Sequence, residues 1–199
     1  MSRAVEELAE LIAEMPGIGP RQARRIVQFL LRTEPSYKKK LTEHIENISD
    51  AVTQCAQCYR YDEVRNKLCS LCADSSRDAT QLMVVEKDVD VESIEHAGVF
   101  PGHYFVLGGL FSLARQRKNK IEPRTTALIK RLKGEDVKEV VLAFATTPEG
   151  DHTAQEVAKT IKDALPSIQV SQLGRGLSLG AEIEYADHET LKNAFRGRH

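Results

Sequence analysis

The sequence predicts an α+β chain of several parts: a helical N-terminal part, a small metal-binding module and a larger α/β part with a parallel sheet. Two observations carry this prediction. The four cysteines of the chain form two Cys-x-x-Cys pairs, at Cys55, Cys58, Cys69 and Cys72. Before them apolar residues recur at helical spacing, whereas after residue 80 short apolar runs alternate with helical patterns. Such alternation is typical of a parallel sheet that helices cover on both faces.

The composition limits the classes of function. Hydrophobic residues make up 41% and charged residues 29% of the 199 residues, as in ordinary globular proteins. The longest apolar runs are too short to span a membrane, and the N-terminal residues contain no apolar signal core. We therefore expect a cytoplasmic protein without a membrane partner. The net charge is −1, but basic residues gather in residues 21–40 and 115–133, which favours either polyanion contact or a solvated surface.

Residues 1–53 are predicted to form a helix-hairpin-helix followed by a third helix. The first helix begins after Ser2 and ends at Pro16, and the second runs from Pro20 to Leu31. Proline suits the first position of a helix, where its missing N–H costs nothing. The third helix, predicted over residues 38–52, aligns Leu41, Ile45, Ile48 and Val52 on one stripe.

The turn of this hairpin predicts a DNA phosphate site. Gly17 and Gly19 let a phosphate approach the backbone closely, and the start of the second helix favours negative charge. Arg21 and Arg25 lie four residues apart on one face and can add ion pairs, and Arg24 flanks them. These contacts would read the DNA backbone and no bases. An ordinary helical hairpin with a Gly-Pro turn is the alternative.

Residues 54–76 are predicted to form a four-cysteine zinc finger. Each Cys-x-x-Cys turn offers two thiolates, and two turns can close a tetrahedron around one ion. Four cysteine ligands leave no open position, so we predict one structural Zn²⁺ per chain. Two disulfides are the alternative, and they require an oxidising compartment. Residues 59–68 are predicted to form a hairpin, and residues 73–79 a linker.

The remaining elements are predicted to alternate. Strands are expected over residues 81–86, 103–107, 137–145 and 167–173, with helices over residues 88–96, 125–132 and 153–165. In parallel sheets, functional groups gather at the carboxyl ends of the strands. Glu86 ends the first strand, and Glu149 follows the third.

Five motifs, in this order, resemble the bacterial recombination mediator family RecR. They are MPGIGPR at residues 15–21, the four cysteines, VVE at 84–86, EG at 149–150, and RG at 175–176 with EYAD at 184–187. The resemblance covers almost the whole chain. It implies a Toprim domain over residues 79–174 and a C-terminal arm over residues 175–199. It also implies a homo-oligomer, as a dimer or a ring-like tetramer that can encircle DNA.

The resemblance further implies partners and a DNA path. RecR proteins work with RecO, and in some bacteria with RecF, to help load RecA onto single strands coated by single-strand binding protein. In the family, basic residues of the hairpin line the DNA path, and Arg21 and Arg25 occupy the matching places.

The Toprim resemblance does not imply catalysis. Toprim enzymes hold Mg²⁺ with a glutamate after the first strand and an Asp-x-Asp run after a later one. Here Glu86 remains, but the two aspartate positions fall on Ala145 and Thr147, and Glu149 is the one carboxylate of that run. The run also departs from the Asn-Pro-Thr that usually precedes Glu-Gly in the family.

We therefore expect a non-enzymatic scaffold with no catalytic residues. Glu86 and Glu149 are candidate contacts for a protein partner. Two other functions stay open: a Toprim metal-dependent nuclease or primase-like enzyme, and a zinc-ribbon adaptor that binds proteins but not DNA.

Overall fold

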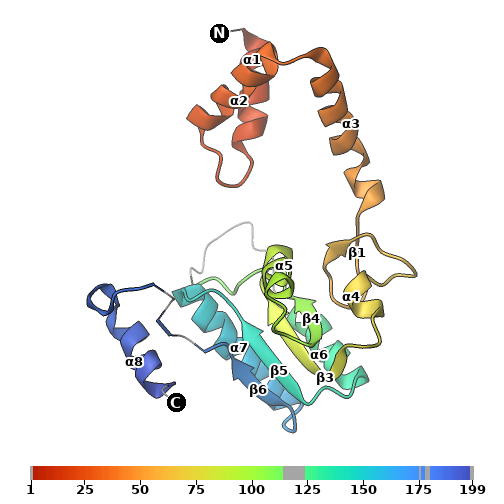
Figure 1. Cartoon of the computed structure of the whole chain (residues 1–199). Helices are drawn as coiled ribbons and strands as arrows, with labels where there is room; N and C mark the ends of the chain where they lie inside the picture. Colours follow the sequence, from red (N-terminus) through yellow and green to blue (C-terminus); the bar gives the residue numbers. More distant parts are fainter. Residues whose placement is uncertain (1, 114–123, 175, 178–179, 198–199) are drawn as a thin grey trace. The chain divides into compact units, whose positions relative to one another are not determined.

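A computed structural model describes residues 2–113, 124–174, 176–177 and 180–197 (Figure 1). The chain separates into two compact units, Met1–Ala51 and Val52–His199, which are described one at a time. Part of the second basic stretch lies outside the described residues, namely Arg115, Arg117, Lys118 and Lys120, as does Arg175 of the C-terminal motif.

The first unit contains three helices, α1 (Arg3–Ala13), α2 (Pro20–Arg32) and α3 (Pro35–Ala51). The predicted hairpin is confirmed, because α1 ends before Pro16 and α2 starts at Pro20 with Gly19 as its N-cap. Gly17 adopts a φ of 77°, a left-handed conformation that glycine accepts without strain. A small core of Ala9, Ile12, Ala23 and Val27 joins α1 to α2.

The third helix differs from its prediction in two ways. It begins at Pro35 instead of residue 38, because proline takes the first helical position. All of its residues are exposed, so its apolar stripe is uncovered in the single chain: Ile45 is 61% and Ile48 60% exposed. The side chain of Leu11 on α1 is also exposed. The first unit therefore presents more apolar surface than one small hairpin core can cover.

The second unit opens with the cysteine module. Strand β1 (Thr53–Gln54) pairs antiparallel with β2 (Tyr61–Asp62), and the short helix α4 (Ser70–Ala73) follows. The hairpin expected between the cysteine pairs, over residues 59–68, is present as a tight antiparallel turn, and β1 and β2 form a second pairing across the first cysteine turn. Within that range one isolated bridge joins Arg65 to Leu68.

The predicted parallel sheet is confirmed. It contains β3 (Asp78–Val85), β4 (Gly102–Val106), β5 (Glu139–Ala143) and β6 (Gln169–Gln172), in the order β4-β3-β5-β6. All three strand pairs are parallel. The linker predicted over residues 73–79 is shorter than expected, because Asp78 already donates its N–H to the carbonyl of Pro101, 3.0 Å away.

Helices cover both faces of this sheet (Figure 1). Helices α6 (Thr125–Gly134) and α7 (Pro148–Ala164) bury Leu128, Val157 and Ile161 against one face. Helix α5 (Asp88–Ala97) buries Val91 against the other face, where Leu71 of α4 also packs. The strands consequently carry apolar residues on both faces, as their sequences indicated.

Two further elements were placed differently or missed. Helix α7 begins at Pro148, five residues before its predicted start, because Thr147 caps it by accepting the N–H of Gly150 at 3.1 Å. The C-terminal arm was predicted without elements. It contains a 3₁₀ turn (Ile183–Tyr185) and helix α8 (His188–Arg196), which Asp187 caps by accepting the N–H of Thr190 at 2.9 Å.

Across the described ranges, no helix combines the length and apolar composition that a bilayer crossing requires.

Candidate nucleic-acid interface and metal centre

The two cysteine turns bring four thiols to one point. The sulfur atoms of Cys55, Cys58, Cys69 and Cys72 all lie within 4.8 Å of one another, and those of Cys58 and Cys69 are 3.5 Å apart. A tetrahedral site with metal–sulfur bonds of about 2.3 Å places its sulfurs about 3.8 Å apart. The observed sulfur–sulfur distances, from 3.5 Å to less than 4.8 Å, lie on both sides of that value. The four cysteines therefore fit a closed four-coordinate metal site.

The thiols influence one another strongly. Hydrogen bonds with Cys58, Cys69 and Cys72 hold the pKa of Cys55 below its usual value. Hydrogen bonding with Cys55 and its neighbours instead raises the pKa of Cys72. A bound dication removes this competition, because metals bind cysteine as thiolate and drive the proton off.

A backbone N–H and an arginine stabilise negative charge on the cysteine sulfurs. The N–H of Cys69 donates to the sulfur of Cys55 at 3.4 Å. Arg60, largely buried beside the cluster, is attracted electrostatically by Cys69 and Cys58. Burial opposes ionisation of Asp62, but its hydrogen bond from Arg60 keeps the pKa of that carboxyl below its usual range. Arg60 thus places a fixed positive charge next to four anionic ligands, and Asp62 orients it.

The cysteine module is built onto the sheet. Strand β4 is an edge strand, and its outward backbone groups need partners. The N–H of Val106 donates to the carbonyl of Cys58, 2.8 Å away. Arg131 donates to the carbonyl of Tyr104 at 2.7 Å and to that of Gln57 at 3.3 Å. The module and one arginine therefore cover the edge that β4 would otherwise expose.

Side chains strengthen this attachment. The side chain of Arg131, only 5% exposed, is paired with Glu135 at 3.0 Å. Glu135 also accepts the amide N–H of Gln57, 2.6 Å away. The ring of Tyr59 packs edge-on against Phe105 and lies under the guanidinium of Arg124, 5.2 Å from the ring centre. Loss of the metal would therefore disturb contacts of the sheet as well as those of the module.

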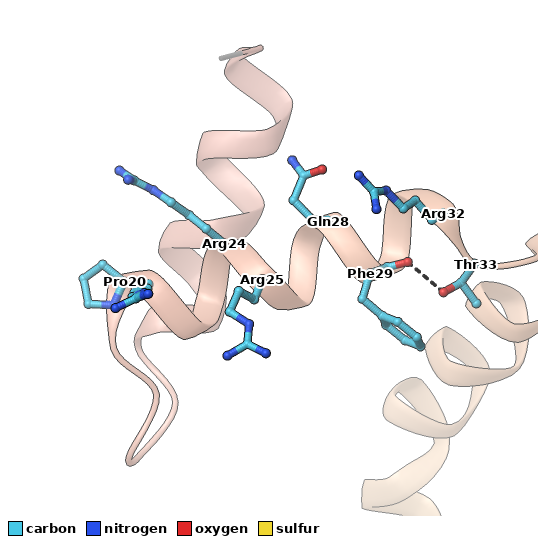
Figure 2. Close-up of a pocket in the computed structure, with 8 residues that line it drawn as sticks. Pro20, Arg24, Arg25, Gln28, Phe29, Arg32 and Thr33 are labelled. Carbon is cyan, nitrogen blue, oxygen red and sulfur yellow. Dashed lines mark hydrogen bonds between the residues drawn. The ribbon is translucent and has the colours of Figure 1, made fainter.

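The three predicted DNA-binding arginines lie on α2, and Gly17 and Gly19 lie in the turn before it, outside the groove lining. Arg21, Arg24 and Arg25 line a shallow groove of about 840 Å³ on the exposed side of this helix (Figure 2). The helix contains no acidic residue. Within the part of the chain that the structure describes, none of these arginines forms an ion pair, so their charge is available to a ligand.

The start of α2 adds backbone donors. The first N–H groups of any helix lack partners within it. Pro20 has no N–H, and Ala23 donates to the carbonyl of Gly19, so the N–H groups of Arg21 and Gln22 are the ones directed outward. A phosphate at this end would meet backbone donors, the helix dipole and arginine side chains together.

Sequence reasoning missed part of the groove. Gln28, Phe29 and Arg32 also line it. The missed signal was a continued spacing of four residues, because Arg21 and Arg25 lead to Phe29, and Arg24 leads to Gln28 and Arg32.

Comparison with known proteins identifies the family. Residues 80–173 match the family model "Toprim domain", and residues 176–199 match "RecR, C-terminal". Three similar curated proteins are each named "Recombination protein RecR". Those of Dehalococcoides mccartyi, Mycolicibacterium smegmatis and Chloroflexus aurantiacus are 35%, 36% and 38% identical to the chain. Each alignment covers 98% of this chain, and 93%, 96% and 93% of the respective relatives. The chain belongs to the RecR family.

The predicted Toprim resemblance of this RecR family member is thereby confirmed, and its two glutamates can be placed. Glu86 directly follows β3, is mostly buried, and pairs with Lys87 at 3.2 Å. Glu149 lies exposed in the first turn of α7. Among the described residues, the four cysteines form the one group of three or more acidic, histidine or cysteine side chains close enough to share a metal. Neither glutamate therefore joins a cluster of carboxylates.

The carboxyl edge of the Toprim sheet is crossed by the chain itself. After β4, Gly108 donates its N–H to the carbonyl of Glu86 at 3.0 Å. Phe111 then donates its N–H to the hydroxyl of the buried Thr153 on α7, 2.8 Å away. This segment ties the end of β4 to the start of α7 at the edge where parallel sheets usually bind ligands.

Proposed function

We propose that this RecR family member is a non-enzymatic DNA-binding mediator of recombinational DNA repair, which acts with RecO, and in some bacteria RecF, to promote loading of RecA. The relatives' shared name, "Recombination protein RecR", supports the recombination role. The observation that carries DNA binding is the acid-free groove of unpaired arginines at the start of α2.

The groove favours a backbone ligand over base recognition. Arg21 and Arg25 form a row that leads from the helix start, where backbone N–H groups point outward. Such a surface attracts phosphates regardless of sequence, and each phosphate contact releases counterions from the DNA. Gly17 and Gly19 belong to the same site, since they keep side chains away from the approaching phosphate.

One site of this kind binds weakly, so we propose a homo-oligomer, as a dimer or a ring-like tetramer. Exposed apolar residues on α3 and α1 support self-association, because a monomer would leave them in water. Linked copies raise the effective concentration of each site on one DNA molecule without new contacts.

We propose Zn²⁺ as the metal, one ion per chain, held by Cys55, Cys58, Cys69 and Cys72. A four-sulfur site with tetrahedral spacing suits zinc, and the absence of an open position makes its role structural. The metal would supply no chemistry to a substrate. It would hold the two cysteine turns closed, while Arg60 offsets their charge.

The Toprim domain is proposed to act as a scaffold. Among the described residues, neither Glu86 nor Glu149 belongs to a group of three or more possible ligands, and two glutamates alone make a poor Mg²⁺ site. Glu86→Gln and Glu149→Gln should leave DNA affinity nearly unchanged and should act, if at all, on RecO binding. Mg²⁺-dependent strand cleavage that either change abolished would instead favour the nuclease or primase-like alternative.

The test of the DNA site is affinity measured as a function of salt. Arg21→Ala with Arg25→Ala should weaken binding to all sequences alike and reduce the salt slope by about one unit per lost phosphate contact. Lys159→Ala with Lys162→Ala, two exposed cations on α7 that do not line the groove, removes the same charge and should change neither quantity. Wild-type slope and affinity in the arginine variant would exclude the hairpin as the DNA site. A wild-type protein that showed no salt-dependent DNA binding would favour the adaptor alternative.

A further inference from the structure

Phe29 is an exposed aromatic side chain at the end of an arginine row. Arg21, Arg25 and Phe29 follow one another at four-residue spacing, so they lie along one side of α2. Figure 2 shows Arg25 and Phe29 projecting on that side, whereas Arg24, Gln28 and Arg32 project on the other. Phe29 is 56% exposed, so the hairpin core leaves most of its ring uncovered.

Two hollows share the side chains of Arg25 and Phe29. The larger groove runs along the arginines. A second hollow of about 290 Å³ is lined by Gln22, Arg25, Ile26 and Phe29. Its lining combines a cation, an amide, an aliphatic side chain and an aromatic ring. Flat aromatic ligands are suited to such a lining, because they stack on the ring and on the guanidinium plane.

The ring of Phe29 contacts a second aromatic ring. Tyr37 packs against it edge to face, with ring centres 5.9 Å apart and an angle of 85° between the planes. The hydroxyl of Thr33 donates to the carbonyl of Phe29 at 2.7 Å, which closes the last turn of α2. The contact with Tyr37 restrains the ring of Phe29 before any ligand arrives, which lowers the entropy cost of binding.

We propose that Phe29 stacks on an unpaired base of single-stranded DNA whose phosphates lie along Arg21 and Arg25. This inference rests on the proposed function, and it adds a preference for unpaired DNA. In a duplex the bases stack on each other, so only an unpaired stretch offers a free base face beside its backbone. The arginines supply sequence-independent attraction, and Phe29 discriminates single-stranded from duplex DNA.

The first experiment compares single-stranded oligothymidine with a blunt duplex of equal length, by fluorescence anisotropy at fixed salt. Phe29→Leu keeps an apolar side chain of similar bulk but has no ring, and should lose roughly tenfold in affinity for the single strand while keeping its duplex affinity. The matched control is Leu31→Ala, since Leu31 is 58% exposed on the same helix but does not line either hollow. Equal single-strand affinity in wild type and Phe29→Leu would overturn the proposal.

The second experiment uses the absence of tryptophan from the chain. Phe29→Trp creates a single reporter, whose emission should fall when oligothymidine saturates the protein and should stay constant with duplex. Leu31→Trp places the same reporter outside the hollows and should respond to neither. Equal responses at both positions would contradict stacking.

The experiments separate this inference from its premise. If the arginine site itself is wrong, the Arg21→Ala, Arg25→Ala variant keeps its DNA affinity, and Phe29→Leu keeps its DNA affinity as well. If only the stacking is wrong, the arginine variant loses DNA affinity, whereas Phe29→Leu binds single-stranded DNA as tightly as wild type. A second copy of the chain is the other occupant that could cover Phe29. A lower native mass for Phe29→Leu, with unchanged single-strand affinity per subunit, would assign the ring to that contact and overturn the proposal.

Discussion

At the scale of single residues, one missing side chain determines how α7 starts. A Cβ atom at Gly150 would lie 2.0 Å from the carbonyl oxygen of Ala145, and backbone cannot move aside cheaply. Glycine is therefore required in the first turn of α7, beneath the cap that Thr147 provides. This gives a packing reason for the Glu149-Gly150 pair, independent of any partner that Glu149 contacts.

We expect Gly150→Ala to lower the free energy of unfolding by about 3 kcal/mol, because the methyl group must displace the backbone around Ala145. Urea unfolding of wild type and variant measures this loss. Gly134→Ala, near the end of α6, is the matched control, since a Cβ there meets nothing within 4 Å. Equal unfolding midpoints for Gly150→Ala and wild type would show that the turn relaxes.

A second residue-scale prediction concerns Glu95, which joins α5 to the sheet. Arg77 contacts its carboxylate at 2.6 and 3.0 Å, and the hydroxyl of Tyr104 donates to it at 2.5 Å. Burial alone would raise the pKa of Glu95, but the hydrogen bonds from Arg77 and Tyr104 hold it below its usual value. A carboxyl group with a lowered pKa stabilises the fold above its unfolded pKa of about 4.3, and this contribution is lost as the pH falls through the folded value.

Glu95→Gln should therefore cost about 2 kcal/mol at pH 7, because it leaves the mostly buried Arg77 without its ionic partner. The loss should shrink as the pH falls through the lowered folded pKa of Glu95, because the wild-type carboxyl is then itself protonated. Unfolding free energies between pH 3 and pH 7 provide the measurement. Glu92→Gln, exposed on the same helix, should change little at any pH. A pH-independent loss for Glu95→Gln would contradict the pKa argument.

At the scale of elements, the sequence predicted the long elements and missed those that depend on tertiary contact. The α1–α2 hairpin, α5 and the four strands of the sheet follow from local periodicity and from Pro and Gly signals. Strands β1 and β2 have two residues each, which is too short for any periodicity. The start of α7 was misplaced although Thr147-Pro148 is a helix-start signal, and α8 was missed although Asp187 precedes an amphipathic segment.

The candidate sites also contain parts that local sequence predicts and parts that depend on tertiary contact. The cysteine cluster and the arginines of α2 were visible as local spacings. The anchoring of the cysteine module by Arg131 was not, because Arg131 contacts Gln57 from 74 positions further along the chain. Phe29 was overlooked because an aromatic residue on an amphipathic helix is ordinarily part of the core, and only its exposure reveals otherwise.

The attachment of the cysteine module to β4 leads to a prediction about metal removal. Chelation, or Cys69→Ser, should remove one zinc ion per chain and lower the melting temperature of the whole α/β unit, because the carbonyl of Cys58 and the ring of Tyr59 pack on β4. Elemental analysis and thermal unfolding measure the two effects. Ser75→Ala, in the exposed connection after α4, is the control. Freshly purified protein without zinc would refute the metal assignment, and an unchanged melting temperature after zinc loss would refute the coupling.

At the scale of the whole molecule, the exposed stripe of α3 predicts self-association. Ile45→Gln with Ile48→Gln should lower the native mass of the assembly, because the change removes apolar area that an oligomer would bury. Native mass spectrometry gives the measurement. Val89→Gln with Val99→Gln alters two exposed apolar residues of the other unit, 58% and 76% exposed, and should leave the mass unchanged.

The same variant tests how assembly supports DNA binding. It keeps all the arginines of α2, so each single site is intact, yet its affinity for a long DNA should fall because the linked copies are gone. Binding to an oligonucleotide too short to reach two sites should change little. Unaltered affinity for long DNA in a dissociated variant would mean that one chain suffices.

The backbone hydrogen bond from Val106 to Cys58 also bears on the order in which the parts of the chain fold. All four cysteines are synthesised before β4 and leave the ribosome ahead of it, and domains form in chain order during synthesis at roughly 5–20 residues per second. We expect the module to close around its metal before its partner strand emerges. The carbonyl of Cys58 would then already be oriented to accept the N–H of Val106. The new edge strand β4 could therefore pair with the folded module instead of with another chain. Metal supply during translation would in this way govern how much newly made protein reaches its folded state.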